Sequence, residues 1–224
     1  MTRNRIEIIT AEASFVDSHT VRLNYADGRG QREATFANIV VVTGTDATRT
    51  ENIPFDGKRI LLSDNILGVD QLPRTLTVVG AGVSGVEYTS FFAALGVRVT
   101  LVDMRPRLLP FVDAETVDTL AYQLRMSRVT LRLGEEVSGI ELIDDERVRV
   151  HLTSGKEIVT EKVLYSVGRT GATDSLDLPA AGLAADDRGR IKVNSSYQTV
   201  VPHIYAAGDV VGFHSLAPTS MEQG

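Results

Sequence analysis

Three glycines and one aspartate stand at spacings that could hold a phosphate-bearing ligand. Gly80, Gly82 and Gly85 lie within Thr77–Tyr88 (TVVGAGVSGVEY), and Asp103 follows Gly85 by 18 residues. In a strand–loop–helix unit the first glycine permits a tight turn, the second lets the backbone approach a pyrophosphate, and the third lets the helix pack against the strand. The N-terminus of the helix then offers unpaired N–H groups and a positive dipole end to the anion. This spacing therefore predicts a dinucleotide site.

The elements that such a loop needs are indicated on both sides of it. Thr75–Val79 (TLTVV) is a short β-branched run typical of a strand, and Val83–Leu95 keeps apolar positions on one helical face. Gly96 supplies a helix stop, and a second strand, Val97–Val102, leads into Asp103. The alternative is a tight turn between strand and helix that holds no ligand. The expected contacts of the loop are Gly80, Ala81, Gly82, Val83, Ser84 and Gly85.

Asp103 and the loop after it bear on which dinucleotide is bound. A carboxylate at the end of the second strand can accept hydrogen bonds from both ribose hydroxyls of NAD. In the stretch Asp103-Met104-Arg105, the guanidinium of Arg105 could pair with the 2′-phosphate of NADP, and Arg107 follows two residues later. A capping aspartate and a solvated basic loop are the alternatives. These residues leave the choice between NAD and NADP open.

Composition excludes several other kinds of chemistry. The chain has no cysteine, so disulfides, thiolate zinc sites and a cysteine nucleophile are excluded within it. Its four histidines, His19, His151, His203 and His214, are scattered without metal-ligand spacing. No nucleophile elbow and no P-loop lysine is present. Any chemistry must therefore come from a bound cofactor.

Charge and hydropathy limit the kinds of partner that the chain can have. The net charge is −6 and no block of lysine and arginine occurs, so a nucleic-acid partner is not expected. No apolar run approaches the roughly 18 residues of a membrane span, and the N-terminal stretch MTRNRIEIIT lacks the apolar core of a signal peptide. We therefore expect a cytoplasmic protein without a membrane partner.

The remaining patterns predict an α/β fold with β-rich flanks. The first 45 residues read as strands with Asp27-Gly28 as a hairpin turn, and residues 46–57 read as a loop. Four elements are expected after Asp103: a helix over Ala114–Met126 capped by Asp113, a third parallel strand over Val129–Leu133, an antiparallel meander over residues 138–162, and a buried strand ending at Gly168-Arg169.

Three ordered motifs together resemble the flavoprotein disulfide reductase superfamily. VVVTG, ending at Gly44, resembles its A-T-G strand, and Thr199–Val210 (TVVPHIYAAGDV) resembles its flavin motif T-x-x-x-x-I-Y-A-x-G-D, with the dinucleotide loop between them. The resemblance implies a Rossmann-like nicotinamide domain, a parallel sheet with an antiparallel meander, inserted in a FAD-binding domain. The expected domains are a partial FAD-binding domain at 1–71, the NAD(P)-binding domain at 72–171 and a second FAD-binding part at 172–224.

Further strings resemble the pyridine nucleotide transhydrogenases of that superfamily. They are GRTGATDSL (Gly168–Leu176), DDRGRIKVNSSYQT and SMEQG. This resemblance implies a FAD-dependent enzyme that passes hydride between NADPH and NAD⁺ through the flavin. A lipoamide dehydrogenase-like enzyme, a mercuric reductase-like enzyme and a nucleotide-binding module without activity of its own stay open as alternatives.

The resemblance also implies roles for single residues. It places Glu87 near the nicotinamide as a catalytic candidate, together with Gly168-Arg169. It places Gly44, Gly208 and Asp209 at the flavin, with Asp209 accepting from the ribityl chain. Full-length members also carry an N-terminal flavin loop and a C-terminal dimerisation domain. We therefore expect an incomplete FAD site, a fragment inactive on its own, and a homo-oligomeric parent.

Overall fold

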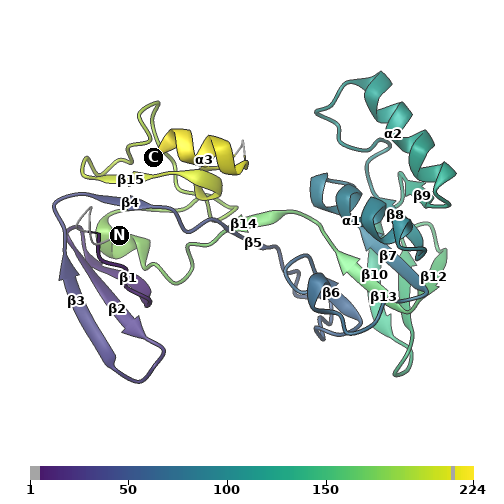
Figure 1. The fold of residues 1–224 in the computed structure, drawn as a ribbon, viewed down its shortest axis with the longest axis horizontal. Helices are drawn as coiled ribbons and strands as arrows, with labels where there is room; N and C mark the ends of the chain where they lie inside the picture. Colours follow the sequence, from purple (N-terminus) through teal and green to yellow (C-terminus); the bar gives the residue numbers. More distant parts are fainter. Residues whose placement is uncertain (1–5, 213–214) are drawn as a thin grey trace. The chain divides into compact units, whose positions relative to one another are not determined.

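The chain divides into two compact units, shown in Figure 1. The computed structural model describes residues 6–212 and 215–224. The first unit comprises Met1–Asp46 and Arg169–Gly224, and the second comprises Ala47–Gly168. The second unit starts ahead of the expected Leu72, because the short strand β6 (Ile60–Leu62) pairs within its sheet. In chain order the second unit is therefore an insertion within the first.

A five-stranded parallel sheet forms the centre of the second unit. Its order is β6, β13 (Lys162–Tyr165), β7 (Thr75–Val79), β8 (Arg98–Asp103) and β9 (Thr130–Leu133), and all neighbours pair in parallel. β7 suits the central position because its last four residues are all buried. The parallel arrangement brings the carboxyl ends of β7, β8 and β13 to one edge of the sheet, where open α/β sheets bind ligands.

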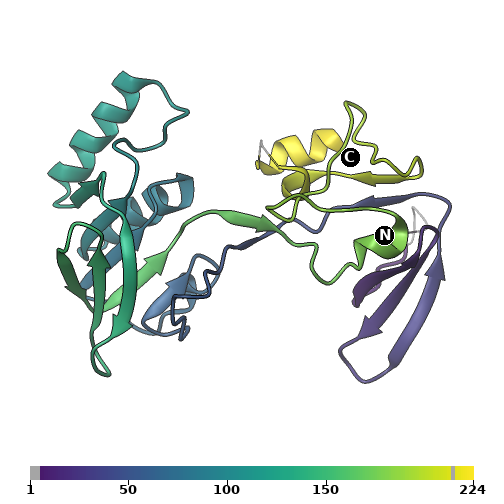
Figure 2. The same cartoon turned by 180° about the vertical axis from the view of Figure 1, so that it is seen from behind.

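Different elements cover the two faces of this sheet. Figure 2 shows the same ribbon as Figure 1 from behind. Helices α1 (Val83–Ala94) and α2 (Ala114–Met126) share one core cluster with Leu76 and Val78 of β7. The meander shares a second cluster with Val79 of the same strand. Neighbouring residues of a strand point to opposite faces, so this division follows from the pleat. The meander consists of β10 (Val137–Leu142), β11 (Val148–Leu152) and β12 (Glu157–Thr160).

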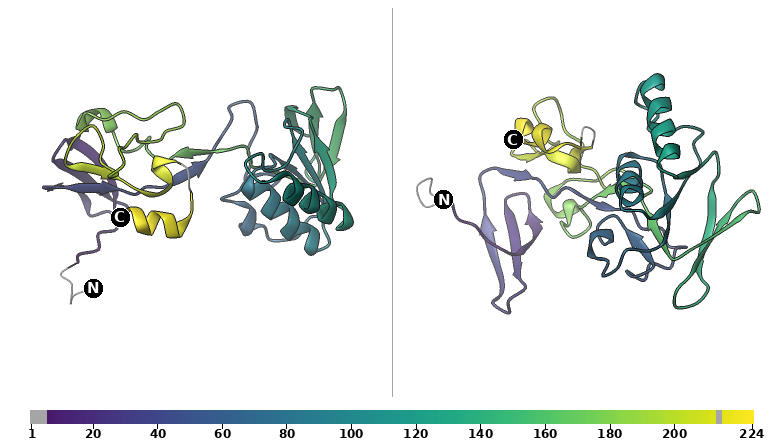
Figure 3. Two further views of the ribbon diagram at one scale, coloured as in Figure 1. Left: turned by 90° about the horizontal axis from the view of Figure 1, so that it is seen from above. Right: turned by 45° about the vertical axis from the view of Figure 1, so that its right-hand side comes forward.

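The first unit combines an antiparallel sheet with a pair of parallel strands. β1 (Glu12–Asp17), β2 (Thr20–Tyr25) and β3 (Gly30–Thr35) form the antiparallel sheet, visible as the purple strands in the right-hand view of Figure 3. The expected hairpin at Asp27-Gly28 is confirmed between β2 and β3. β1 and β2 form another hairpin that the sequence did not indicate separately.

The parallel pair joins segments from the two ends of the chain. β4 (Ile39–Val41) pairs with β15 (Ile204–Ala206), with Ile39 opposite Ile204 and Val41 opposite Ala206. These strands carry the VVVTG and IYAAGD motifs, so the pairing brings the two motifs side by side. Phe15 and Ile191 pack in the same core cluster as Ile204. Residues on both sides of the inserted unit therefore build one core.

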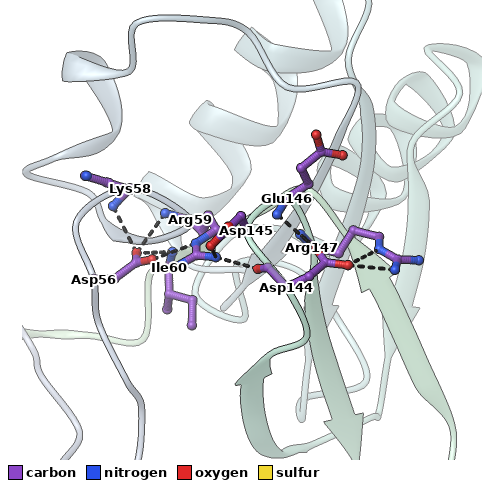
Figure 4. Close-up of polar contacts among 8 residues, drawn as sticks. All are labelled: Asp56, Lys58, Arg59, Ile60, Asp144, Asp145, Glu146 and Arg147. Atoms are coloured by element: carbon purple, nitrogen blue, oxygen red, sulfur yellow. Dashed lines mark hydrogen bonds and ion pairs between the residues drawn. The ribbon is translucent and has the colours of Figure 1, made fainter.

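Charged side chains tie the β10–β11 turn to the segment before β6, as Figure 4 shows. The Asp56 carboxylate accepts hydrogen bonds from the N–H groups of Lys58–Ile60 and from the Arg59 guanidinium. The Arg59 guanidinium also donates to the carbonyl oxygen of Asp144 in the turn, at 2.5 Å. This network fixes the meander to a segment far away in the sequence.

Short elements complete the described chain. They are β5 (Thr45–Ala47), which pairs with β14 (Arg169–Gly171), the 3₁₀ helices η2 (Ile66–Gly68), η3 (Leu178–Ala181) and η4 (Gly208–Val211), and the helix α3 (Ala217–Gln223). Within residues 6–212 and 215–224, no helix has the length and apolarity to cross a bilayer. The same residues contain no cluster of acidic or histidine side chains suited to a metal ion. His214 lies outside the described residues.

Candidate dinucleotide site

The three glycines of the loop between β7 and α1 occupy three different environments. At Gly80 the backbone has φ +102°, and a β-carbon there would collide with the carbonyl group of Ser166, whose carbon would lie at 2.9 Å. At Gly85 a β-carbon would collide with the carbonyl oxygen of Gly80. At Gly82 a β-carbon would meet no atom within 4 Å. Gly80 and Gly85 are therefore required by the protein's own packing. Gly82 faces open space that a pyrophosphate group could occupy.

The N-terminus of α1 is left open for an anion. Gly82 is its N-cap residue, and no side chain caps the helix within the described chain. The first helical hydrogen bond runs from the N–H of Val86 to the carbonyl of Gly82, at 3.0 Å. The loop itself is held from behind, because the N–H of Gly80 donates to the carbonyl of Val102 at 2.8 Å. An uncapped helix N-terminus beside a glycine loop fits a pyrophosphate group.

Asp103 ends β8 as a buried carboxylate that already has four donors. Its Oδ2 accepts from the N–H of Ala81 at 2.5 Å and from the Arg105 guanidinium at 2.6 Å. Its Oδ1 accepts from the main-chain N–H and the Nε of Arg105, both at 2.8 Å. Burial raises the pKa of this carboxyl, but the hydrogen bonds from the Arg105 side chain and the two N–H groups outweigh it, so the pKa lies below its ordinary value. Asp103 is therefore a charged link between the glycine loop and the arginine loop.

The two loop arginines differ in their partners. The Arg105 guanidinium is bound to Asp103, which raises its pKa, yet its side chain is still 42 % exposed. Arg107 is exposed and has no hydrogen-bond or ion-pair partner among the residues that the structure describes. Met104, between Asp103 and Arg105, is also exposed. The loop thus presents one paired and one unpaired cation beside the ribose position of the expected ligand.

Glu87 lies on the exposed side of α1. It has no hydrogen-bond or ion-pair partner within residues 6–212 and 215–224. Val83 and Phe91, one turn before and one turn after it, are each 51 % exposed. A carboxylate in the middle of an exposed apolar stripe is free to meet a cation or a polar ligand.

Gly168 and Arg169 follow β13 by a few residues. The carbonyl oxygen of Gly168 accepts from the N–H of Thr48 at 3.3 Å, and its φ is +86°. The Nε of Arg169 donates to the Oγ1 of Thr45 at 2.7 Å, and a second guanidinium nitrogen donates to the Thr45 carbonyl. This guanidinium therefore binds the neighbouring strand β5.

The residues expected at a flavin all lie in the first unit. The N–H of Gly208 donates to the Oε1 of Gln223 at 2.7 Å, and Gly208 has φ +77°. Gly44 follows β4, and its carbonyl oxygen accepts from the N–H of Ala172 at 3.0 Å. The half-buried carboxylate of Asp209 has no partner within the described chain, so it can accept a hydroxyl hydrogen bond from a ligand.

A model of the pyridine nucleotide-disulphide oxidoreductase family matches residues 1–224 of the chain. The chain belongs to this family. It is 47 % identical over its full length to a soluble pyridine nucleotide transhydrogenase of Mycobacterium tuberculosis, of which it covers 48 %. It is 45 % identical over 222 residues to the protein of the same name from Colwellia psychrerythraea, of which it covers 47 %. The chain therefore spans about half the length of these relatives.

Solved structures of the same superfamily share the fold. The HOCl-induced flavoprotein disulfide reductase RclA from Escherichia coli matches with a TM-score of 0.87 and 29 % identity, over 97 % of this chain and 48 % of that one. LpdA from Mycobacterium tuberculosis matches with a TM-score of 0.89 and 28 % identity, over 96 % of this chain and 48 % of that one. The mixed α/β fold, with parallel and antiparallel strands, is thus the fold of flavoprotein disulfide reductases.

The pairing of Asp103 with Arg105 was not foreseen from the sequence, and the Asp-x-Arg spacing is only a partial signal for it. Asp27 and Arg29 have the same Asp-x-Arg spacing, and their side chains pair in the same way, at 2.8 Å. In both cases the carboxylate also accepts from the main-chain N–H of the arginine. At Asp186 the same spacing does not give this ion pair, because the carboxylate binds the Arg190 side chain instead, so Asp-x-Arg spacing alone does not predict a self-paired arginine.

Proposed function

We propose that this chain is the NAD(P)-binding part, with adjoining FAD-binding segments, of a cytoplasmic, FAD-dependent transhydrogenase that moves hydride between NADPH and NAD⁺. The single observation that carries the proposal is the glycine loop, in which Gly82 faces open space at an uncapped helix N-terminus. The relatives named soluble pyridine nucleotide transhydrogenases support this reading over disulfide reduction, because they are 44–47 % identical, against 29 % for the solved flavoprotein disulfide reductase RclA.

Each part of the proposed site has its own task. The loop Gly80–Gly85 and the start of α1 bind the pyrophosphate, and Asp103-Met104-Arg105 binds the adenosine ribose. Gly168-Arg169 and Glu87 lie toward the nicotinamide. We propose that residues 72–171 form the NAD(P)-binding domain, with β6 of the preceding segment joined to its sheet, and that residues 1–71 and 172–224 otherwise carry the flavin-binding parts. The work of the protein is to hold and orient the coenzyme.

The flavin contacts proposed in the first unit are Gly44, Gly208 and Asp209. The unpartnered, half-buried carboxylate of Asp209 fits a hydroxyl-bearing ligand such as the ribityl chain of FAD. When bound, the flavin supplies the hydride acceptor and donor. We propose that the whole protein is a homo-oligomer that uses nicotinamide dinucleotides and no nucleic acid.

Gly82→Ala tests the dinucleotide site directly. The backbone at Gly82 has an ordinary φ of −76° and a β-carbon there meets no protein atom, so the variant should fold. A methyl group in contact with the pyrophosphate should weaken binding of both NADH and NADPH by about tenfold or more. Isothermal titration calorimetry of the chain measures both affinities.

Gly68→Ala is the matched control for this experiment. Gly68 lies in η2, outside the proposed site, and a β-carbon there also meets no atom within 4 Å. The control should bind both coenzymes as the unchanged chain does. Unchanged affinity in Gly82→Ala, or equal losses in both variants, would remove the glycine loop as the pyrophosphate site.

A further inference from the structure

We propose that Asp103 and Arg105 form a switch in which the Arg105 side chain has two positions, and that this switch lets one site accept both NADH and NADPH. The proposal rests on the proposed dinucleotide site and deepens it. It concerns how the 2′ position of the adenosine ribose is recognised. It differs from the expectation that Asp103 binds NAD while Arg105 separately binds NADP.

The Asp103 carboxylate can accept only a limited number of hydrogen bonds. An ionised carboxylate has about four acceptor positions. Four donors already occupy them: the N–H of Ala81, the N–H of Arg105, and the Nε and one terminal nitrogen of the Arg105 guanidinium. No position is left for a ribose hydroxyl while the guanidinium is in place. Asp103 can therefore accept from NAD only after the Arg105 side chain has moved.

The paired state suits NADPH. A guanidinium carries five N–H groups, of which two bind Asp103, so three are free for a ligand. The Arg105 side chain is 42 % exposed whereas Asp103 is 4 % exposed, so the free N–H groups are on the accessible side of the pair. The guanidinium also neutralises the carboxylate, which would otherwise repel a 2′-phosphate. In this state the phosphate meets a cation and no bare anion.

The unpaired state suits NADH. If the Arg105 side chain moves into solvent, two acceptor positions on Asp103 become available for the two ribose hydroxyls. The N–H groups of Ala81 and Arg105 keep the carboxylate in its place. The main chain does not need to move, since the carbonyls of Asp103 and Arg105 are held by the N–H groups of Glu135 and Gly134, at 3.1 and 3.0 Å. The switch is therefore a rotation of one side chain on a fixed loop.

A double-mutant cycle on the chain tests this coupling. The variants are Arg105→Ala, Asp103→Asn and the double variant, with NADH and NADPH affinities measured by calorimetry at one ionic strength because salt screens the phosphate interaction. Asparagine at position 103 still offers an oxygen to the N–H of Ala81. Thermal unfolding of each variant establishes that it is folded.

The switch predicts opposite changes for the two coenzymes. Arg105→Ala should weaken NADPH binding by about 10- to 150-fold, while NADH binding stays equal or tightens because the carboxylate is freed. Asp103→Asn should weaken NADH binding and leave NADPH binding equal or tighter. The loss of NADPH affinity caused by Arg105→Ala should be smaller in the Asp103→Asn background, since the repelling carboxylate is then absent.

Two arginine controls separate this switch from general electrostatics. Arg98 is exposed at the other end of β8, so Arg98→Ala should change neither affinity. Arg107→Ala removes the unpaired loop arginine, and any effect it has on NADPH should be the same with Asp103 or with asparagine at position 103. The switch would be overturned if the two substitutions changed NADPH affinity independently of each other. It would also be overturned if Arg105→Ala weakened the binding of both coenzymes equally.

The outcomes also separate this inference from the proposed function. If the unchanged chain binds neither coenzyme, the proposed dinucleotide site is wrong and the switch fails with it. If the chain binds both and Gly82→Ala weakens binding of both as predicted, the site stands, and the double-mutant cycle alone decides on the switch. Should Asp103→Asn fail to fold, the ratio of NADH to NADPH affinity in Arg105→Ala decides, and an unchanged ratio contradicts the switch.

Discussion

Asp56 shows how one side chain can stabilise a connection between distant segments. Burial raises the pKa of its carboxyl, but hydrogen bonds from three N–H groups and from the Arg59 guanidinium outweigh it and lower the pKa from 3.8 to about 2. Arg59 in turn binds the β10–β11 turn through the Asp144 carbonyl. The charged form of Asp56 is therefore favoured by the folded state, and the difference in pKa corresponds to about 2 kcal/mol.

Asp56→Asn should lower the free energy of unfolding by about 2 kcal/mol at neutral pH. A lowered folded-state pKa gives a contribution that is complete above the unfolded value of 3.8 and is lost as the pH falls toward about 2. The difference between the variant and the unchanged chain should therefore shrink below pH 4. Urea unfolding of both proteins between pH 7 and pH 3 measures this difference in the free energy of unfolding. Amide exchange in β7 and β8 shows whether the change occurs in the second unit.

Asp145→Asn is the control, since Asp145 is fully exposed and lies 3.9 Å from the Arg59 guanidinium. Its effect should stay within about 0.5 kcal/mol. A pH-independent difference for Asp56→Asn would show that the carboxylate charge is not what stabilises the segment.

At the residue scale, the sequence predicts which side chains gather at the site but not how they bind one another. Gly80, Gly82 and Gly85 were each assigned a task from spacing alone, and the environments of Gly80 and Gly85 agree with those tasks. The sequence did not predict that Arg105 occupies the acceptor positions of Asp103. The family pattern gives Asp103 a role toward a bound ligand and says nothing of its partners within the protein. The pairing depends on the side-chain geometry of a two-residue turn, which spacing does not determine.

The contact between α1 and β7 depends on the absence of a side chain at Gly85. A β-carbon there would lie 3.0 Å from the carbonyl carbon of Gly80 and 3.6 Å from a methyl carbon of Val78, besides colliding with the Gly80 oxygen. Both neighbours belong to the loop or the central strand and cannot move independently. The helix must therefore shift away from the sheet if Gly85 gains a side chain.

Gly85→Ala should destabilise the second unit by about 1–3 kcal/mol or more, the usual cost of an overpacked core contact. Gly82→Ala, three residues earlier and without protein neighbours, should cost less than about 1 kcal/mol. Thermal unfolding of the two variants gives the comparison. Equal stability of Gly85→Ala and the unchanged chain would contradict the close approach of α1 to the loop.

Elements with a clear period or cap were predictable, and short ones were not. The helix α2 has the bounds expected, and Asp113 caps it by accepting from the N–H groups of Glu115 and Thr116. The meander was predicted over residues 138–162, and its three strands lie within residues 137–160. β6 was missed as a strand because three apolar residues show no period, and only their pairing with β13 makes them a strand.

At the scale of the whole molecule, the chain builds two separate sets of cores. One cluster draws on both flanks of the inserted unit, whereas the two clusters around the parallel sheet lie wholly within Ala47–Gly168. The pairing of β4 with β15 could be predicted only from the resemblance of their motifs to a known family, since no local pattern links strands so far apart.

The central claim is that the loop between β7 and α1 holds a nicotinamide dinucleotide, and amide NMR with added NADPH tests it most directly. We predict that the largest shift changes fall on the N–H groups of Gly80–Gly85, with further changes at Asp103–Arg105 and smaller ones along the meander. The N–H groups of Gly82–Ser84 should respond most, since the proposed site puts the phosphates at the N-terminus of α1. Shifts confined to the first unit, or none at saturating NADPH, would contradict the account.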